Sequence, residues 1–462
     1  MNKIKICYIG GGSRNWAWVL MQDLAFEKEI SGTIELYDIK HDDAVTNEII
    51  GNRLMTQHNE ERWKFHANPS LADALNGSDF VIISILPGDF EEMAVDVHAP
   101  EKYGIYQSVG DTAGAGGIIR SLRAIPQFRQ IAREIKKHAP FAWVINYTNP
   151  MSICTRVLYK EFPDIKAFGC CHEVFHTQKL LARVLEEAGL AETGSIKRDE
   201  IKVNVIGINH FTWIDKASWK DIDIFPYYKK YVEKYAEANF KKQSVKSNTG
   251  LSDDEIERNK YFNSSDFVKM DLFRRYGLIA AAGDRHLSEF CPPSWYLSSP
   301  ETVERWGFAL TPVSWRIKDR EKLKQKTSAY KDGTLEIKPV ESGEEGIKII
   351  KALTGHGDLT TNVNLPNRGQ LLDLPKESVV ETNACFSLNN IKPIITDKIP
   401  VDILALINHH SLSQEGIIEA AFEKDIEKAY RIFSHDFALQ KLPLKDSRVL
   451  FDEMCAATKV QL

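Results

Sequence analysis

The chain has 462 residues, of which 43% are hydrophobic and 27% are charged, and this length suits two or three domains with a large core. Its net charge of −5 argues against a general nucleic-acid or membrane-surface binder. No apolar run is long enough to predict a membrane-spanning helix.

The N-terminal part alternates between apolar strand patterns and amphipathic helix patterns. The strand patterns are almost continuously apolar, which is typical of a parallel sheet covered on both faces. We expect strands at 4–9, 33–37, 80–85, 143–147 and 167–171, and helices after residue 12 and over 118–137. This alternation predicts an α/β fold with a Rossmann-like, doubly wound parallel sheet of the lactate/malate-dehydrogenase type.

The pattern changes after about residue 195. A strand is predicted at 201–208 and a long helix at 403–430. Two polar stretches, 241–260 and 316–331, are typical of solvated helices or loops, and we assign them no function. We therefore predict a Rossmann-like domain over 1–195 and a C-terminal α+β domain over 196–462.

A glycine-rich turn follows the first predicted strand. Gly10 permits a tight turn, and Gly12 allows the backbone to approach a pyrophosphate at the N-terminus of the next helix. Asp38 ends the second strand, where a carboxylate accepts hydrogen bonds from a ribose and repels a 2′-phosphate. We expect Gly10, Gly12, Ser13 and Asp38 to bind NAD; the alternative is a purely structural turn.

Cys171 and His210 are candidate metal ligands, because a thiol and an imidazole bind soft or borderline cations. Two protein ligands leave coordination positions open, which suits a catalytic metal rather than a structural one. Ligand softness alone favours Zn²⁺ or Fe²⁺. Without further information, a buried cysteine and a core histidine would be the simpler interpretation. The seven cysteines lack disulfide spacing, and no apolar leader is present, so we expect a cytoplasmic protein with reduced thiols.

Six short segments along most of the chain carry glycines, polar residues or metal-binding residues. They are Ile9-Gly10-Gly11-Gly12-Ser13, Asn146-Tyr147-Thr148-Asn149-Pro150, Cys171-His172-Glu173-Val174, Gly207-Ile208-Asn209-His210-Phe211, Gly283-Asp284 and Asn364-Leu365-Pro366-Asn367-Arg368-Gly369. Together, and in this order, they resemble glycoside hydrolase family 4, the NAD- and metal-dependent glycosidases. Cys-His-Glu-Val is similar to the uronide-cleaving branch, which implies α-galacturonides as substrates. His172 replaces the Asp or Asn of the phospho-sugar branches, which speaks against a phosphorylated substrate.

The resemblance implies a redox-assisted elimination. NAD⁺ takes hydride from C3 of the sugar, a base removes the C2 proton, the aglycone leaves with help from an acid, water adds, and the hydride returns. Mn²⁺ is the metal that the family implies, with Cys171 and His210 as its ligands and substrate hydroxyls in the open positions. Cys170, the neighbouring thiol, is expected in the core.

The resemblance also implies roles for three catalytic residues. His172 matches the general acid, although it can instead orient a sugar hydroxyl. Asp284 matches a candidate base for the C2 proton; Tyr276 or a bound water is the alternative, and an aspartate beside a glycine is often only a turn former. Asp111 matches an acidic residue that supports the base or holds the substrate.

Asn149, Arg285 and His286 are expected to bind the substrate. A uronate carboxylate calls for a cation, preferably an arginine that donates two hydrogen bonds. Several arginines in family-like segments are candidates, and the sequence does not choose among them: Arg120, Arg123, Arg285 and Arg368.

Other functions stay open from the sequence. An α-glucuronidase or α-galactosidase differs from an α-galacturonidase by one or two hydroxyl contacts. A lactate/malate-type dehydrogenase would carry out net oxidation without a metal. A non-catalytic nucleotide-binding protein would keep only the cofactor site. The partners we expect are a small sugar uronide and a second or further copies of the chain, as a homodimer or homotetramer, without nucleic acid or membrane.

Overall fold

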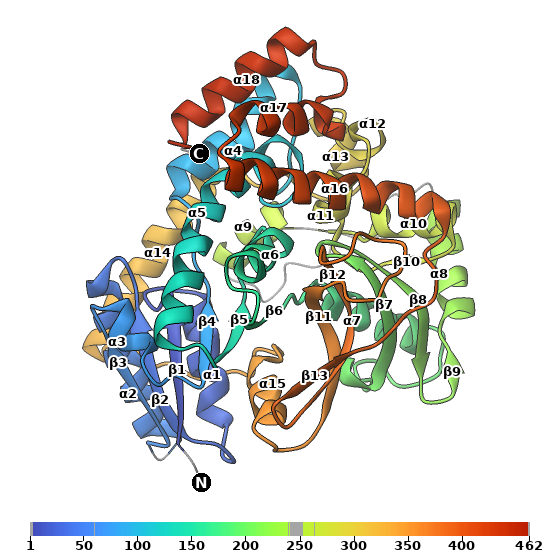
Figure 1. Cartoon of the computed structure of the whole chain (residues 1–462). Helices are drawn as coiled ribbons and strands as arrows, with labels where there is room; N and C mark the ends of the chain where they lie inside the picture. Colours follow the sequence, from blue (N-terminus) through green and yellow to red (C-terminus); the bar gives the residue numbers. More distant parts are fainter. Residues whose placement is uncertain (1–2, 60, 239, 241–252, 263, 461–462) are drawn as a thin grey trace.

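The computed structural model describes residues 3–59, 61–238, 240, 253–262 and 264–460. A nine-stranded sheet runs through the molecule in the order β13-β12-β11-β6-β5-β4-β1-β2-β3 (Figure 1). Six of these strands come from the N-terminal part: β1 (Ile4–Ile9), β2 (Gly32–Tyr37), β3 (Trp63–Ala67), β4 (Phe80–Ile83), β5 (Trp143–Asn146) and β6 (Lys166–Gly169).

These six strands are all parallel, in the order β3-β2-β1-β4-β5-β6. This order is that of a doubly wound Rossmann sheet, so the predicted fold class is confirmed. The chain reverses direction across the sheet between β1 and β4, and ligands of such sheets bind outside the carboxyl ends of the strands at this point. The sequence did not predict β3, whose exposed Lys64 and His66 interrupt the apolar pattern at the edge of the sheet.

Helices connect these strands and cover the sheet. The predicted helix at 118–137 is confirmed but begins earlier, at Gly114. The helices of this part are α1 (Trp16–Phe26), α2 (His41–His58), α3 (Leu71–Leu75), α4 (Phe90–His98), α5 (Gly114–His138), α6 (Met151–Glu161) and α7 (Glu173–Glu187), with a short 3₁₀ helix η1 (Ala99–Tyr103).

The C-terminal part contributes three antiparallel strands to the same sheet: β11 (Leu359–Pro366), β12 (Val379–Ser387) and β13 (Asn390–Pro393). β11 joins the Rossmann strands by pairing Asn364 with Gly169 of β6. A second sheet, in the order β10-β8-β7 with β9 on β8, lies beside it. Its strands are β7 (Ile201–Ile208), β8 (Phe211–Trp219), β9 (Ile222–Asp223) and β10 (Ile279–Ala280).

The remaining helices pack around the second sheet, against the Rossmann part or over the C-terminal end of the core. They are α8 (Phe225–Glu237), α9 (Asp253–Phe262), α10 (Phe267–Tyr276), α11 (Asp284–Leu287), α12 (Pro293–Tyr296), α13 (Pro300–Arg305), α14 (Val313–Asp332), α15 (Gly346–Leu353), α16 (Val401–Glu423), α17 (Ile426–His435) and α18 (Leu444–Ala457), with 3₁₀ helices η2 (Arg198–Glu200), η3 (Ser288–Phe290) and η4 (Phe437–Leu439). Of these, α14 and α15 pack against the Rossmann part, and α16 to α18 pack over the C-terminal end of the core.

The prediction of one helix over 403–430 is wrong, because two helices occupy this range. α16 ends at Glu423, where Lys424 takes the left-handed conformation with φ 59°. The Asp425 side chain then accepts a hydrogen bond from the Lys428 N–H and caps α17. The apolar spacing continues across this break, so periodicity alone did not reveal it. Of the polar stretch at 241–260, residues 241–252 lie outside the described residues.

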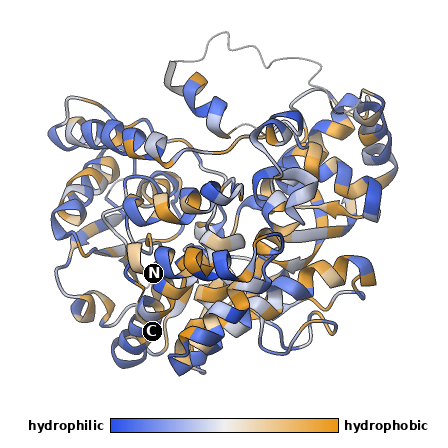
Figure 2. Ribbon diagram, turned by 90° about the horizontal axis from the view of Figure 1, so that it is seen from above, coloured by the Kyte–Doolittle hydropathy of each residue, from blue (hydrophilic) through white to orange (hydrophobic). Residues whose placement is uncertain are grey.

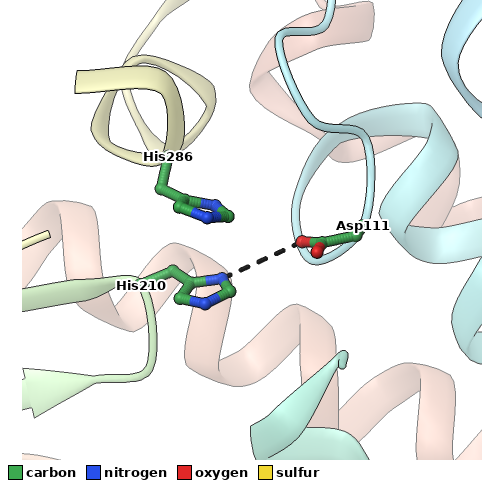
Figure 3. A group of neighbouring side chains, drawn as sticks. All are labelled: Asp111, His210 and His286. Atoms are coloured by element: carbon green, nitrogen blue, oxygen red, sulfur yellow. Dashed lines mark ion pairs between the residues drawn. The ribbon is translucent and has the colours of Figure 1, made fainter. Parts of the chain in front are cut away.

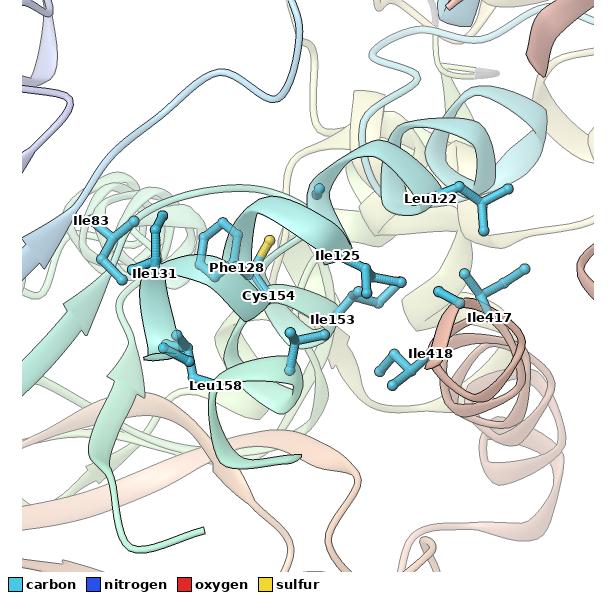
Figure 4. Close-up of a cluster of buried hydrophobic side chains, with 14 of the residues drawn as sticks. Ile83, Leu122, Ile125, Phe128, Ile131, Ile153, Cys154, Leu158, Ile417 and Ile418 are labelled. Atoms are coloured by element: carbon cyan, nitrogen blue, oxygen red, sulfur yellow. The ribbon is translucent and has the colours of Figure 1, made fainter. Parts of the chain in front are cut away.

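The main core joins the two ends of the sequence. Figure 4 shows Ile125 and Phe128 of α5, Ile153 of α6, and Ile417 and Ile418 of α16 in one apolar cluster. Figure 2 shows hydrophobic residues gathered along the inner elements, whereas the peripheral helices alternate between hydrophilic and hydrophobic faces. Among the described residues, no helix is long and apolar enough to cross a membrane.

Candidate active site

The tip of the β7–β8 hairpin places His210. Asn209 and His210 form the two-residue connection between the paired residues Ile208 and Phe211. His210 has φ 66°, a conformation that costs a residue other than glycine roughly 1–2 kcal/mol. The side chain is only 2% exposed. Strain of this kind persists where the surrounding structure holds a residue in place, and it is frequent at functional sites.

His210 meets two other side chains that can bind a cation, Asp111 and His286 (Figure 3). Their ligand atoms all lie within 4.8 Å of one another. The His210 and His286 rings stack with centroids 3.7 Å apart. His210 Nδ1 lies 3.9 Å from Asp111 Oδ1. The three residues come from the loop before α5, from the β7–β8 turn and from α11, so the site joins both parts of the chain.

Thr112 fixes the protonation of the His210 ring. Its hydroxyl donates to Asp111 Oδ1 at 2.6 Å and lies 3.0 Å from His210 Nδ1. A carboxylate oxygen only accepts, so the Thr112 hydrogen is committed to Asp111 and the oxygen must accept from Nδ1–H. His210 is therefore the Nδ1–H tautomer, and its Nε2 lone pair is available to a metal.

Charges in this cluster are strongly coupled. Burial, together with the neighbouring His286, lowers the pKa of His210 to about 3, so the imidazole is neutral. Burial opposes ionisation of Asp111, but His210, His286 and Arg120 outweigh it and hold the pKa of that carboxyl well below its usual range. The site thus combines a neutral imidazole with an ionised carboxylate.

Cys171 follows the end of β6 and is buried. Its thiol hydrogen-bonds the side chain of Asn209, the residue before His210. Burial and the nearby Glu381 raise the pKa of the thiol well above its usual value. Glu381, in turn, accepts hydrogen bonds from Asn209 at 3.1 Å and from Asn362 at 2.7 Å. The two predicted ligands are therefore linked through Asn209, and Cys171 lies beside the Asp111–His210–His286 group rather than within it.

His172 and Glu173 begin α7 at the edge of this group. His172 is 33% exposed, and its Nε2 lies 3.9 Å from Glu173 Oε1. The same oxygen lies 3.9 Å from His286 Nε2, while Glu173 Oε2 accepts a 2.7 Å hydrogen bond from the Gly283 N–H. Burial raises the pKa of Glu173, but His286, His172 and His210 outweigh burial and hold it well below its usual range. Glu173 thus contacts both His172, the predicted acid, and Gly283, which precedes the predicted base Asp284.

Asp284 is completely buried but faces away from this cluster. Its Oδ1 accepts a 3.0 Å hydrogen bond from the Lys269 N–H, near the start of α10, and its Oδ2 has no partner among the described residues. Burial, together with Asp266, raises its pKa to about 7. The structure therefore brings His172 and Asp111 to the cluster and places Asp284 against α10.

Asn149 lies directly beside Asp111, with its Nδ2 3.3 Å from Asp111 Oδ2. Asn149 Oδ1 and His286 Nδ1 are buried and have no hydrogen-bond partner among the described residues. Unpaired buried polar atoms are costly, so both are suited to a bound hydroxyl. Arg285 instead holds the loop before α5, since its Nη2 donates to Ser108 O at 2.7 Å.

The four candidate arginines have separate positions. Arg123 is buried in an ion pair with Asp96, and Arg368 is 59% exposed beside Glu377, so neither is free to bind a substrate in the cluster. Arg120 and Arg285 lie near Asp111, whose charge acts on both.

The predicted nucleotide turn connects β1 with α1. At Gly10, φ is 95°, and a Cβ would lie 2.0 Å from Ser84 O, so only glycine fits. Asp38 Oδ2 accepts a 2.9 Å hydrogen bond from the Gly12 N–H, and its Oδ1 accepts one from Lys40. Ser13 Oγ accepts from the N–H of Trp16, the first residue of α1. The Trp16 ring lies 5.6 Å from that of His172, so this turn adjoins the cluster.

Sequence reasoning assigned no role to Thr112, Asn209, Glu173 or Glu381. Asn209 and Glu173 lie inside the quoted motifs, and this is the signal that could have identified them. Thr112 follows Asp111 directly, but nothing in the sequence places it against His210. Glu381 comes from β12, and the sequence alone gives no reason to connect it with Cys171.

The two parts of the chain each match a sequence model of one family. Residues 5–187 match the model described as "Family 4 glycosyl hydrolase". Residues 205–438 match the model described as "Family 4 glycosyl hydrolase C-terminal domain".

Individual relatives match over the full length. An alpha-galacturonidase of Thermoanaerobacter italicus is 54% identical over 98% of this chain and 95% of its own. A crystal structure described as a Bacillus subtilis glucosidase is 47% identical and superposes with a TM-score of 0.90 over 98% of this chain and 100% of its own. A 6-phospho-alpha-glucosidase from gut microorganisms, solved in complex with NAD and Mn²⁺, has 19% identity and a TM-score of 0.80 over 99% of this chain and 98% of its own, and shares the fold.

Proposed function

The chain belongs to family 4 of the glycosyl hydrolases, and from this premise we propose that it hydrolyses α-galacturonides with the help of NAD⁺ and a divalent metal, Mn²⁺ above all. One observation carries the choice of sugar: the full-length relative at 54% identity is an alpha-galacturonidase. The lactate/malate-type dehydrogenase alternative has no support from the family, because a glycosidase returns the hydride and carries out no net oxidation.

The residues at the cofactor turn fit a dinucleotide. The backbone packs closely against Ser84 at Gly10 and against Leu36 at Gly11, so a Cβ at either position would overlap its neighbour. Because no side chain projects from these glycines, a dinucleotide can approach the backbone of the turn closely. We propose that Gly10, Gly12, Ser13 and Asp38 hold NAD. Asp38 favours NAD over NADP, because a carboxylate repels a 2′-phosphate.

The residues of the cluster, together with Cys171 beside it, fit a divalent cation. Cys171 supplies sulfur, His210 supplies a neutral nitrogen with a free lone pair, and Asp111 supplies ionised oxygen nearby. Asn209, bonded to Glu381, orients the Cys171 thiol. We propose Cys171 and His210 as the ligands, with Asp111 and His286 facing the same space.

When bound, NAD⁺ would accept hydride from C3 of the sugar, and the metal would polarise the oxygen at that carbon. His172 would donate a proton to the leaving oxygen, since it is partly exposed and faces Glu173. Asn149 and His286 would bond sugar hydroxyls through their unpaired atoms. Asp111 and Asp284 are the two proposed candidates for the base that removes the C2 proton: Asp111 lies inside the cluster, whereas Asp284 is buried against α10 and would have to turn toward the sugar.

The deciding assay combines the protein with an aryl α-galacturonide, NAD⁺, Mn²⁺ and a reductant. We expect release of the aryl group that depends on both additions and that stops with EDTA. Cleavage that persists unchanged in EDTA contradicts the metal-dependent reaction. Parallel reactions with aryl α-glucuronide and α-galactoside test the sugar, and stoichiometric NADH release without cleavage would favour the dehydrogenase.

The identity of the base has its own test. A substrate deuterated at C2 should exchange deuterium with solvent, and the exchange should be slower in Asp111→Asn or Asp284→Asn, whichever carboxylate acts. Cys171→Ser and His210→Ala should abolish cleavage but leave NAD affinity unchanged. Unchanged cleavage in both variants would contradict these two residues as ligands, whereas NAD binding without any cleavage, untouched by either substitution, would support the non-catalytic alternative. We also propose that the protein works in the cytoplasm, where NAD is available. We further propose that it forms a homodimer or homotetramer, and light scattering measures this oligomeric state.

A further inference from the structure

Three guanidinium groups from different elements interact electrostatically with Asp111: Arg120 on α5, Arg285 on α11 and Arg316 in the first turn of α14. Among the described residues, none of the three forms an ion pair with a carboxylate; Arg120 and Arg285 donate to carbonyl and hydroxyl oxygens only. This sets them apart from Arg320, also on α14, which pairs with Asp89 at 2.7 Å. Buried or half-buried cations are usually paired, so a group of three guanidinium groups without a directly paired carboxylate is unusual.

The free donors are on Arg120 and Arg316. Arg120 is only 6% exposed, and its single hydrogen bond runs from Nε to the carbonyl of Asn149 at 3.2 Å. Its two terminal nitrogens have no partner among the described residues. Arg316 has no hydrogen bond within the same residues and lies 5.3 Å from the Phe262 ring centroid. Arg285 lies 4.8 Å from that ring, but its Nε and Nη2 are occupied by Ala309 and Ser108.

The three cations act on one another. Burial and Arg316 lower the pKa of Arg285 to about 10. Burial also lowers the pKa of Arg316, Arg120 adds to this effect, and Asp111 opposes it. The acids whose charges reach Arg285 or Arg316 are Asp111, Asp319, Glu289 and Glu173. Asp111 carries a single negative charge and pairs with none of the three guanidinium groups, so an additional anion among them would be stabilised.

We propose that Arg316, together with Arg120, binds the C6 carboxylate of the uronide, while Arg285 holds the loop that carries Asp111. This inference rests on the proposed function and names the residues that select the acidic sugar. The C6 carboxylate is attached at C5, across the pyranose ring from C2 and C3. A sugar whose C2–C3 edge faces His210 and Cys171 therefore directs its carboxylate away from these two residues, toward the opposite side of the cluster. A guanidinium matches a carboxylate with two parallel hydrogen bonds. The polar stretch at 316–331 thus gains a role at its first residue.

The test compares Arg316→Gln and Arg316→Lys with the wild-type protein, with Arg320→Gln as the matched control on the same helix. Each is assayed with aryl α-galacturonide and aryl α-galactoside, and the affinities for free galacturonate and galactose are measured by calorimetry. We expect R316Q to raise KM and Kd for the acidic sugar by roughly 10- to 100-fold, and to leave galactose and galactoside values unchanged. R316K should fall between, and R320Q should equal the wild type.

The experiment distinguishes a failure of the proposed function from a failure of the role assigned to Arg316. If the wild type does not cleave the galacturonide, the proposed function fails. If it does, but R316Q keeps the wild-type KM for galacturonide, or loses both sugars equally, the assignment of Arg316 is overturned. NAD affinity monitors folding of each variant. Should R316Q lose it, R316K decides the same comparison, because it keeps the charge and lacks only the paired hydrogen bonds.

Discussion

At the scale of single residues, Thr112 shows how a neighbour determines what a ligand can do. Its hydroxyl hydrogen is committed to Asp111 at 2.6 Å, so its oxygen accepts from His210 Nδ1–H at 3.0 Å. The His210 ring is thereby oriented with Nε2 free. Groups that orient metal ligands in this way usually matter almost as much as the ligands.

We therefore expect Thr112→Val, which keeps the shape but lacks the hydroxyl, to weaken Mn²⁺ affinity by about 10- to 100-fold. Thr112→Ser should retain wild-type affinity, since it keeps the hydroxyl. Calorimetry measures the affinity, and ¹⁵N NMR of the imidazole measures the tautomer. Wild-type affinity together with an unchanged Nδ1–H tautomer in the valine variant would contradict this role.

The local geometry of the glycine turn was predictable from single residues. Gly10 has a positive φ and Asp38 bonds the turn, while the binding of NAD by these residues stays a prediction. Arg316 shows the limit: it begins a polar stretch that looks solvated, and only the packing of α14 brings it toward Asp111. The surroundings of Asp284 were equally invisible, because the sequence does not reveal that α10 lies on that side.

At the scale of elements, short loops carry the site and larger elements hold those loops. The β7–β8 turn carries His210, the start of α7 carries His172 at the edge of the cluster, and the segment before α5 carries Asp111. η4 supports the last of these segments from the C-terminal part. Its N-cap residue, Asp436, accepts hydrogen bonds from the N–H groups of Ala438 and Gly114.

This contact predicts a pH dependence. Burial raises the pKa of Asp436 from 3.8 to about 6, and its two hydrogen bonds from backbone N–H groups only partly oppose this. The neighbouring His409 and His410 both have pKa values lowered by burial. A raised acid pKa means that the folded state keeps its proton longer than the unfolded state does. The stability from this group is thus complete below pH 4 and is lost as the pH rises to about 6, by about 3 kcal/mol.

The measurement is the free energy of unfolding in urea between pH 4 and pH 7. The wild-type value minus that of Asp436→Asn should fall by about 3 kcal/mol across this window, because the amide cannot ionise. Asp425→Asn, at the partly exposed N-cap of α17, serves as the control. A difference that stays constant with pH would show that Asp436 is ionised throughout.

At the scale of the whole molecule, the two ends of the chain share one core and one sheet. β11 pairs with β6, and side chains of α16, α17 and α18 pack with those of α5 and α6. We propose residue 195 as the boundary between the nucleotide-binding part and the C-terminal part, with the metal and substrate site between them, because Asp111 and Cys171 precede the boundary and His210 and His286 follow it. Folding should nevertheless involve both parts together.

Phe451 of α18 tests this coupling, since it is fully buried and packs on Phe433 with ring centroids 5.1 Å apart. Phe451→Ala should lower the free energy of unfolding by about 3–5 kcal/mol. NAD binding should then be lost at a lower urea concentration, in the same unfolding transition as the rest of the chain. Circular dichroism and NAD binding, followed together against urea, measure both. Val449→Ala, at a 42% exposed position of the same helix, should change stability by less than about 0.5 kcal/mol. Loss of α18 packing without loss of NAD binding would contradict the shared core.

The sequence by itself determined the Rossmann-like sheet, the family and the chemical character of the site. The two family matches and the strand order confirm the first two. These features are local: apolar periodicity predicts strands and helices, and short motifs carry their chemistry within a few residues.

Tertiary structure alone decided which side chains meet. It brought Asp111, His210 and His286 together from three separate segments, placed Asp284 against α10, and directed Arg316 toward Asp111. The reason is physical: such contacts depend on how distant elements pack, and packing responds to the shapes of all the buried side chains at once, which no local pattern records.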